Sequence, residues 1–329
     1  MKIAIVRLSS LGDIIKNAST IQMIKKYYPN SEITWVVDSI FADILDNTKE
    51  LDNIIKIDLK RLKKDFSFKK LKKEFSKLPK NYFDVVIESH GMLKASLIAK
   101  YISKNKVCGF DKIIKEKLSK LFYQESYPFE CDENEIYRYN KLSANCLKFS
   151  FEKEDIYKLE PFLGFEDKDY SKYDKFFKEK NIILAFGSSK GWEAKKYPLE
   201  KWINIINNLE YNFLLIWGNG DEKKEAEYIA SKTDATILPK SSFNDLKYLV
   251  SKSDIIIGND TGPTHIGWAI GTKSIILFGC TDRNLMIEND NHLSIKSTSK
   301  VNHCKFDKMD FSISEIDETL IINKIKELI

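Results

Sequence analysis

Short apolar runs alternate with helical stretches along this chain, and the series occurs twice. Five runs in the first half have the length and apolar character of buried strands, at 2–8, 33–37, 54–57, 83–87 and 107–110. Five more follow in the second half, at 181–186, 212–217, 235–238, 254–257 and 273–278. Strands that are apolar on both faces are typical of parallel sheets covered by helices on each side. The alternation therefore predicts an α/β protein with two doubly wound, mainly parallel sheets.

A polar and acidic stretch between 152 and 174 separates the two series. It has no helical or strand periodicity, as expected of a connection between domains. We therefore expect an N-terminal domain at 1–165 and a C-terminal domain at 166–329. Two such domains facing each other across a cleft would form a ligand site, because loops at the carboxyl ends of parallel strands converge. The last predicted helix, 315–329, is a candidate to pack back onto the N-terminal domain.

The composition is that of an ordinary globular protein, with 43% apolar and 31% charged residues. No apolar run reaches the roughly 20 residues that cross a bilayer, and the first strand passes directly into a turn, so we expect a cytoplasmic protein. Five scattered cysteines without a C-x-x-C pair predict free, mostly buried thiols rather than disulfides or a zinc site. Four histidines without H-x-x-x-H spacing give no sign of a metal centre.

Positive charge is concentrated in one segment, Lys56 to Lys80. It holds eleven Lys or Arg against three acids, although the net charge of the whole chain is only +5. Such a segment is either a solvated helix face or a patch that meets an anionic partner, such as a membrane surface or a phosphorylated lipid. No aromatic residues are interleaved with the charges in the manner of a nucleic-acid module, so we expect no nucleic-acid partner.

The most informative turn is GNDTGPTH at 258–265, which lies between a predicted buried strand and a predicted helix. A strand, a turn and a helix start in this order direct backbone N–H groups toward an anion. Thr261 and Gly262 would meet a diphosphate, and Asp260 would accept hydrogen bonds from sugar hydroxyls. His265 has two interpretations, a phosphate donor or a satisfied helical histidine. We interpret the turn as the phosphate end of a nucleotide-sugar site.

Three other turns follow predicted strands. In SSLGD at 9–13, Asp13 is either a helix cap or a carboxylate that accepts a proton from an incoming hydroxyl. In GSSKGWEAKKYP at 187–198, lysines would neutralise a leaving phosphate, unless the loop is simply solvated. In WGNGDE at 217–222, an acid at the strand end suits a ribose, although the same residues also suit helix capping.

The order and spacing of these turns resemble the lipopolysaccharide heptosyltransferases. The similarity rests on RLSSLGD at 7–13, HGMLK at 90–94, KKYP at 195–198, WG at 217–218 with Glu222, and DTG at 260–262 with His265. It extends over nearly the whole chain and is closer to heptosyltransferase I than to heptosyltransferase II. The resemblance implies the GT-B architecture, with two facing Rossmann-like domains and a central cleft. It also implies an inverting glycosyltransferase.

The resemblance implies a donor, an acceptor and a place in the cell. Heptose would pass from ADP-heptose to a Kdo sugar of Kdo2-lipid A, in lipopolysaccharide inner-core synthesis at the inner face of the bacterial inner membrane. Asp13 matches the general base of the family, and Lys195 matches its lysine near the donor phosphates. The other donor residues implied are Ser188, Ser189, Glu222, Asp260, Thr261, Gly262 and His265, and the acceptor residues are Ser10, Gly12, His90, Gly91 and Lys94. Ser188 and Ser189 stand where the family has a Thr-Thr pair.

No metal or cofactor is expected for this chemistry, because helix-end amides and a lysine can stabilise a departing diphosphate. The string Asp167-Lys168-Asp169 has the form of a D-x-D metal motif, but it lies in the predicted connection between domains. Three alternatives remain at this point. They are heptosyltransferase II or a related nucleotide-sugar transferase, a nucleotide-sugar epimerase of the same architecture, and a non-catalytic anion-binding protein.

Overall fold

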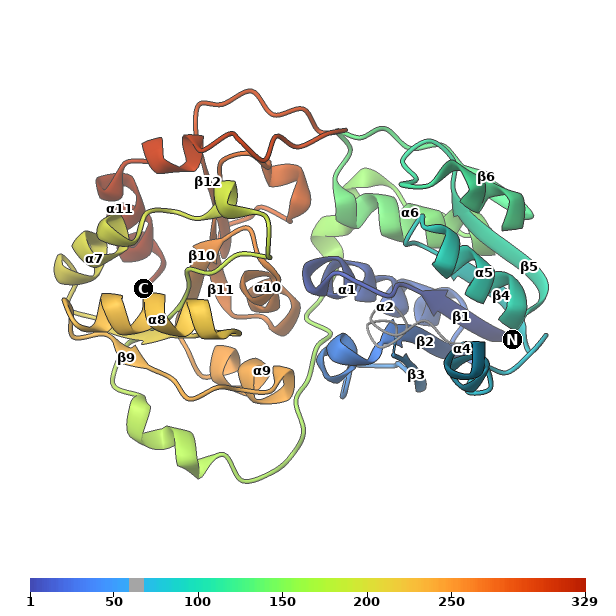
Figure 1. The fold of residues 1–329 in the computed structure, drawn as a ribbon, viewed down its shortest axis with the longest axis horizontal. Helices are drawn as coiled ribbons and strands as arrows, with labels where there is room; N and C mark the ends of the chain where they lie inside the picture. Colours follow the sequence, from blue (N-terminus) through green and yellow to red (C-terminus); the bar gives the residue numbers. More distant parts are fainter. Residues whose placement is uncertain (59–67) are drawn as a thin grey trace. The chain divides into compact units, whose positions relative to one another are not determined.

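The computed structural model describes residues 1–58 and 68–329, and divides them into two compact units, Met1–Gly164 and Phe165–Ile329. Each unit contains one six-stranded sheet whose paired strands all run parallel (Figure 1). This confirms the α/β class and the two doubly wound parallel sheets.

The first sheet has the strand order β3-β2-β1-β4-β5-β6. Its strands are β1 (Lys2–Val6), β2 (Glu32–Asp38), β3 (Asn53–Ile57), β4 (Phe83–Glu88), β5 (Ser103–Phe110) and β6 (Glu125–Tyr127). The α-helices of this unit are α1 (Leu11–Ala18), α2 (Thr20–Tyr27), α4 (Phe68–Phe75), α5 (Leu93–Ile102) and α6 (Glu135–Leu147). Short 3₁₀ helices complete it, namely η1 (Ser39–Ile44), η2 (Lys117–Phe122) and η3 (Lys153–Lys158).

The second sheet repeats the arrangement with the order β12-β11-β10-β7-β8-β9. Its strands are β7 (Asn181–Ala185), β8 (Asn212–Leu215), β9 (Thr236–Ile237), β10 (Ile255–Asn259), β11 (Lys273–Phe278) and β12 (His292–Lys296). Its α-helices are α7 (Leu199–Asn207), α8 (Gly220–Ala230), α9 (Phe243–Ser251), α10 (Ile266–Ile270) and α11 (Glu318–Leu328). The 3₁₀ helices are η4 (Ser171–Phe176), η5 (Glu193–Lys195), η6 (Gly262–His265), η7 (Arg283–Leu285) and η8 (Ser312–Glu315).

Strands β1 and β10 lie inside their sheets and carry apolar side chains on both faces, for example the adjacent residues Ile5 and Val6 in β1, and Ile255 and Ile256 in β10, each at most 1% exposed. Burying such branched side chains is the main term that stabilises each unit.

The strand order that the two sheets share has a consequence for function. The chain reverses direction across the sheet between β1 and β4 in the first unit, and between β7 and β10 in the second. The crevice beyond the carboxyl ends of strands at such a switch point is where open α/β sheets bind ligands.

Several expectations need correction. Strands β6 and β12 were not predicted; both are edge strands, and the three residues of β6 are too few to show a period. Two helices, α1 and α2, follow the first turn. Ser19 separates them, and its hydroxyl donates to the backbone oxygen of Lys16 at 2.8 Å, a bond that competes with regular helix geometry.

The expectation of free thiols is wrong for Cys108 and Cys146, which form a disulfide with a Cα–Cα distance of 6.0 Å. Cys108 lies in β5 and Cys146 in α6, which packs against that strand, so a separation of 38 residues in sequence becomes a contact in the fold. Cys280 is a buried free thiol.

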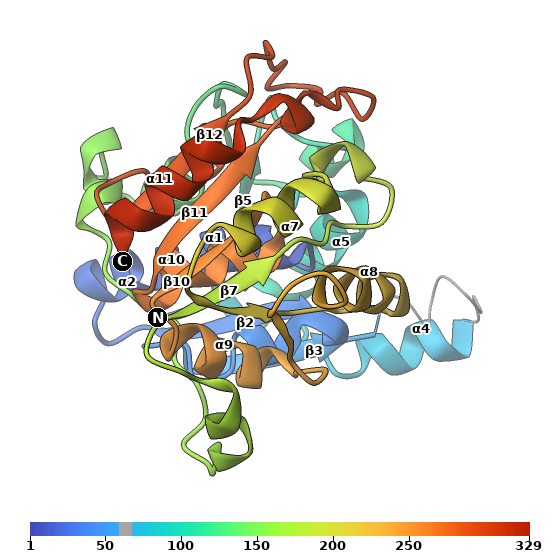
Figure 2. The ribbon, with the colours of Figure 1, turned by 90° about the vertical axis from the view of Figure 1, so that its left-hand side faces the viewer.

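The last helix packs within its own unit. Ile321, Ile325 and Leu328 of α11 belong to the core of the second unit, and α11 contacts α7 and β11 (Figure 2). Its apolar face therefore packs onto the second unit's own core.

Candidate active site

In the first unit, the segment that follows β1 brings Asp13 into a cluster of positive charge. Asp13 lies in the first turn of α1, and its Oδ2 is 2.7 Å from Nη2 of Arg7. The same oxygen accepts hydrogen bonds from the backbone N–H of Ser10 at 3.1 Å and from the Ser10 hydroxyl at 2.7 Å. Nζ of Lys16, one helical turn later, is 3.9 Å from Oδ1. Asp13 is therefore both a helix cap, as one interpretation predicted, and a carboxylate held among cations.

Electrostatics keep Asp13 ionised. Burial alone would raise its pKa, but the charges of Arg7, Lys16 and Lys115 outweigh burial and hold the pKa of Asp13 well below its usual value. Its side chain keeps 19% of its surface exposed, so an incoming hydroxyl can still reach it. The arrangement supplies a fixed negative charge throughout the physiological pH range.

A second carboxylate balances the cations on the other side. Glu135, at the start of α6, pairs with Lys16, whose own side chain is only 5% exposed. Arg7 is also buried, and its guanidinium lies 5.3 Å from the ring centroid of Tyr139. Buried cations of this kind are retained only when carboxylates pair with them. Lys16 and Glu135 thus fix the surroundings of Asp13, and sequence reasoning did not select either.

Strand β4 ends on the other side of this switch point, next to β1. Its last residue, Glu88, is fully buried and accepts hydrogen bonds from the backbone N–H groups of His90 at 2.7 Å and Gly91 at 3.0 Å. Its carboxylate also accepts from the hydroxyls of Ser96 and Tyr123. Burial raises the pKa of Glu88, and these hydrogen bonds offset only part of that effect. Glu88 holds the turn in place; the only available signal in the sequence was an acid directly after an apolar run.

His90 joins the two turns. Its Nδ1 accepts the backbone N–H of Leu8 at 3.2 Å, so the neutral ring carries its proton on Nε2, which lies 3.0 Å from Sδ of Met92. Burial, together with the charges of Arg7, Lys115 and Lys94, lowers the pKa of His90 to about 2. His90 therefore remains a neutral donor at any physiological pH.

The remaining predicted acceptor residues surround this junction. Gly12 is the second residue of α1 and Lys94 the second residue of α5. Gly91 has a φ of +69°, which favours glycine, and a Cβ there would lie 3.2 Å from Cα of Ile114. The structure thus brings Ser10, Asp13, His90 and Gly91 to one end of the first sheet.

In the second unit, β7 and β10 approach so closely at their carboxyl ends that Gly258 is required. A Cβ at Gly258 would lie 2.2 Å from the backbone oxygen of Ala185. Asn259 then crosses between the strands, because its Nδ2 donates to the backbone oxygen of Gly187 at 3.2 Å and its Oδ1 accepts the N–H of Tyr197 at 3.1 Å. This amide, which sequence reasoning did not select, connects the 258–265 turn to the loop after β7.

Asp260 is the centre of the donor-side cluster. It is 6% exposed, and its Oδ2 lies 2.5 Å from Nζ of Lys195. Its Oδ1 lies 3.1 Å from Nε2 of His265. A ring nitrogen of His265 therefore contacts Asp260, and both interpretations of His265 stay predictions. The Lys195–Asp260 pair fixes both side chains, and part of the lysine charge is balanced before any ligand binds.

The turn itself offers N–H groups. Thr261 precedes η6 and Gly262 begins it, followed by Pro263, which has no N–H. The first N–H groups of a helix have no partner within it, so those of Thr261 and Gly262 are suited to an anion. Nearby, the buried hydroxyl of Ser188 has no hydrogen-bond partner, whereas Ser189 is exposed.

Glu222 lies at the start of α8, where its Oε2 accepts the N–H of Gly218 at 2.7 Å. A Cβ at Gly187 would lie 2.5 Å from Oε1 of Glu222, so the carboxylate rests against the end of β7. The structure thus gathers Lys195, Glu222 and Asp260 at the carboxyl ends of β7, β8 and β10, the edge at which sheets of this kind hold nucleotides.

The D-x-D string noted in the sequence lies outside this edge. In the D-x-D string, Lys168 pairs with Asp245 at 3.0 Å and Asp169 accepts the N–H of Ser171, so the string forms a turn. Across residues 1–58 and 68–329, no group of three or more His, Cys, Asp or Glu is arranged to hold a metal ion.

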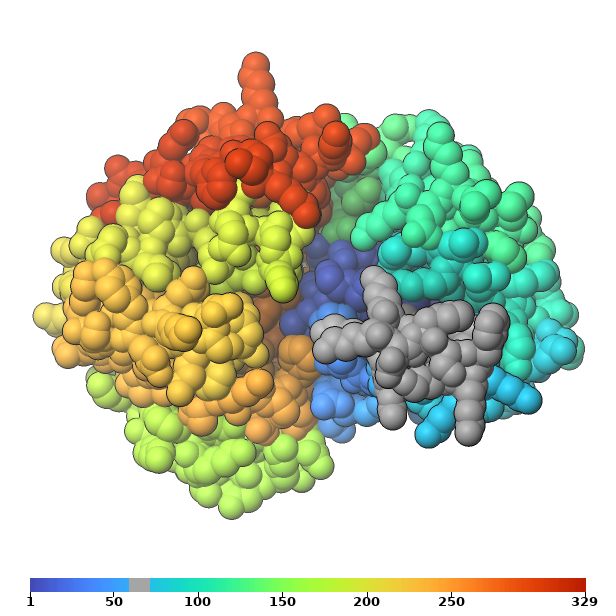
Figure 3. Space-filling view, in the orientation of Figure 1, coloured from blue at the N-terminus to red at the C-terminus, as the bar shows by residue number. Residues whose placement is uncertain are grey.

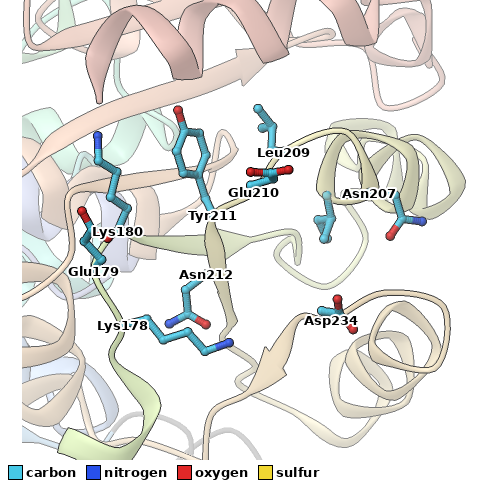
Figure 4. A pocket seen from close by; sticks show the side chains of 10 residues that line it. Lys178, Glu179, Lys180, Asn207, Leu209, Glu210, Tyr211, Asn212 and Asp234 are labelled. Atoms are coloured by element: carbon cyan, nitrogen blue, oxygen red, sulfur yellow. The ribbon is translucent and has the colours of Figure 1, made fainter.

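A separate pocket lies at the opposite, amino-terminal edge of β7 and β8 (Figure 4). Among its lining residues are Lys178, Tyr211, Asn212 and Asp234, and none of the predicted site residues lines it.

The basic segment is only partly described. Residues 59–67, with four of its cations, lie outside the described residues. In the described part, Lys72 and Lys73 of α4 are exposed, while Lys77 pairs with Glu74 at 2.5 Å. Lys56 pairs with Asp43 at 3.3 Å. No helix in the part that the structure describes is long and apolar enough to cross a membrane.

Comparison with known proteins gives consistent matches. A family model described as glycosyltransferase family 9 (heptosyltransferase) matches residues 71–309. A lipopolysaccharide heptosyltransferase 1 from Campylobacter coli is 34% identical over 346 aligned positions, covering all of this chain and 99% of that protein.

Solved structures agree on the fold. A glycosyl transferase family 9 protein from Veillonella parvula has a TM-score of 0.81 at 18% identity, covering 99% of this chain and 96% of that one. The Escherichia coli heptosyltransferase WaaC with ADP has a TM-score of 0.78 at 20% identity, and the match covers both chains fully. The GT-B fold is shared with these proteins.

Proposed function

This chain belongs to glycosyltransferase family 9, the heptosyltransferases, and on that premise we propose that it moves L-glycero-D-manno-heptose from ADP-heptose to a Kdo sugar of Kdo2-lipid A. The observation that carries the proposal is the pair of charged clusters at the two switch points. One holds an ionised carboxylate, Asp13, and the other holds the Lys195–Asp260 pair beside the N–H groups at the start of η6.

In the proposed reaction, the acceptor hydroxyl attacks the anomeric carbon of the donor from the face opposite to the ADP group, and the configuration inverts. The bond from the anomeric carbon to the diphosphate oxygen breaks as the new glycosidic bond forms. Asp13 takes the proton of the hydroxyl. A carboxylate with a low pKa is a weak base, so we expect proton transfer late in the step, when bond formation has made the hydroxyl strongly acidic.

On the donor side, the negative charge that develops on ADP is met by Lys195 and by the N–H groups of Thr261 and Gly262. We propose that Glu222 accepts hydrogen bonds from the ribose hydroxyls and that the Ser188 hydroxyl donates to the diphosphate. Asp260 would accept hydrogen bonds from the sugar hydroxyls. These groups supply the charge compensation that a metal would otherwise provide, so we propose that no cofactor takes part. Turnover that is unchanged in excess chelator is the expected result.

Asp13→Asn tests the mechanism. Asparagine keeps an oxygen for the Ser10 N–H but cannot take the proton, so turnover should fall about 10²- to 10⁴-fold while ADP binding is retained. Circular dichroism and ADP titration serve as controls for folding. Turnover within tenfold of the unaltered protein would remove Asp13 from the role of base.

The acceptor separates the proposed activity from its alternatives. Transfer to Kdo2-lipid A that carries no heptose is expected of the proposed enzyme. A requirement for an acceptor that already carries one heptose would indicate heptosyltransferase II. Release or epimerisation of the sugar without any acceptor would indicate the epimerase alternative.

We place this reaction at the inner face of the bacterial inner membrane, because the proposed acceptor is a lipid. The exposed lysines of α4, Lys72 and Lys73, support contact with its anionic surface. Replacing both by glutamine should weaken transfer to vesicle-embedded acceptor more than transfer to a soluble Kdo oligosaccharide. Equal effects on the two acceptors would contradict this role.

A further inference from the structure

The 3₁₀ helix η2 sorts its side chains into three rows. A 3₁₀ helix has three residues per turn, so side chains at i and i+3 lie directly above one another. Leu118 and Leu121 therefore form one row, and Lys117 and Lys120 a second. The third row begins with Ser119, which is fully buried and faces the unit. The leucine row is left on the outside.

The leucine row is unusually exposed. Leu118 is 60% and Leu121 77% accessible, and Leu121 is the most exposed of the large apolar side chains in the part of the chain that the structure describes. The teal part of the chain, to which η2 belongs, reaches the surface on the face drawn in Figure 3. Exposing two leucines in one row costs free energy in water, so a surface that covers them is expected.

Positive charge lies beside the leucines. Lys117 is exposed, and Lys120 of the same row pairs with Asp111. Leucines that project beside lysines are the pattern of a segment that lies in the interface of an anionic bilayer, where the apolar side chains enter the acyl boundary and the ammonium groups remain among headgroup phosphates. A second copy of this chain would instead bring the same lysines together.

The element is fixed rigidly to the acceptor turn. The backbone N–H groups of Lys115 and Glu116 both donate to the backbone oxygen of Gly91, at 3.0 and 3.2 Å. At the other end, the hydroxyl of Tyr123 donates to the buried carboxylate of Glu88. The two ends of η2 are thus hydrogen-bonded to Gly91 and Glu88, the residues that shape the His90–Gly91 turn. A surface bound by Leu118 and Leu121 would be held beside the place where we put the acceptor.

We propose that η2 is a membrane-docking element, in which Leu118 and Leu121 insert into the interface of an anionic lipid bilayer and the neighbouring lysines bind its headgroups. This extends the proposed function, because it explains how a lipid-borne acceptor is presented to the turn at Gly91. It differs from the basic segment at 56–80 in resting on apolar insertion as well as on charge.

Vesicle partitioning of the full chain tests the proposal without any turnover. The protein is sedimented with vesicles of phosphatidylcholine alone, or with a minority of phosphatidylglycerol. Leu121→Gln should weaken partitioning into the anionic vesicles about tenfold. Lys117→Gln should weaken it about fivefold and lose its effect at high salt. The matched control is Leu320→Gln, at a 44% exposed leucine of α11 in the other unit, which should leave partitioning unchanged.

Each result has one meaning. Equal partitioning of Leu121→Gln and the unaltered protein overturns the proposal. So does a fall in the mass of the free protein on ultracentrifugation of Leu121→Gln, because that result assigns the leucines to a contact between copies. Transfer to a soluble Kdo oligosaccharide is assayed separately with the unaltered protein. If that transfer is normal and Leu121→Gln partitions like the unaltered protein, only the docking element is refuted. If that transfer is absent and Leu121→Gln partitions more weakly, only the proposed function is refuted.

Discussion

Acid should destabilise the first unit through His90. In the unfolded chain this residue has the ordinary pKa of 6.5, whereas in the fold the pKa is about 2. Between these values the unfolded chain binds one more proton than the folded one. A depressed pKa of this kind contributes stability that is fully present above pH 6.5 and is lost as the pH falls.

The size of the loss follows from the two pKa values. At pH 5 the unfolded residue is about 97% protonated and the folded one is almost entirely neutral, which corresponds to about 2 kcal/mol less stability than at neutral pH. The result depends on the unfolded pKa and hardly at all on the folded one, provided that the latter stays below about 4. Asp13 does not contribute in this range, because its pKa is low in both states.

The matched variant is His90→Asn. Its Oδ1 can accept the Leu8 N–H that Nδ1 of His90 accepts, but it does not titrate. Hydrogen–deuterium exchange of the peptide covering β4 reports on the first unit and gives its opening free energy at pH 5 and 7. The unaltered protein should lose about 2 kcal/mol more than the variant over that interval. The same pH dependence in both proteins would refute the reasoning, since another group would then be responsible.

Three further changes test other parts of the structure. Lys195→Gln should weaken ADP binding about ten- to a hundredfold in calorimetry, because a charge-assisted hydrogen bond is lost, and unchanged affinity would remove the lysine from the donor site. Gly258→Ala should lower the free energy of unfolding by more than about 2 kcal/mol in urea titrations. The control, Gly220→Ala, has open space around the new Cβ and should leave the free energy of unfolding nearly unchanged. Equal stabilities of the two variants would contradict the close approach of β7 and β10. Glu88→Gln should raise the KM for the acceptor while the KM for ADP-heptose stays constant, and parallel changes in both would show a general loss of folding instead.

Much of the fold was predictable from local patterns in the sequence. Apolar runs such as 83–87 and 254–257 depend only on neighbouring residues, and they were sufficient to predict two parallel sheets. The edge strand β6 was not predicted, because its three residues are too few to show a strand period. Pairing with β5 holds them in place. The same reason explains Cys108 and Cys146, whose contact arises only when α6 lies on β5.

The turns at the ends of these strands show the same division. Charged and small residues after apolar runs marked Asp13, Lys195, Glu222 and the 258–265 turn as candidates, because a strand end followed by a helix start is visible in sequence. The partners of these residues were not visible. Arg7 and Ser10 are local to Asp13, but Glu135, which holds Lys16, is more than a hundred residues away.

The sequence by itself thus determined the class of fold, the family resemblance and the turns that carry function, since each is written in short-range patterns. Only the tertiary structure decided what those side chains do: that Asp13 stays ionised among buried cations, that His90 stays neutral, and that His265 contacts Asp260 beside Lys195. The physical reason is that charge state and hydrogen-bond geometry depend on burial and on neighbours distant in sequence, and packing brings those neighbours together.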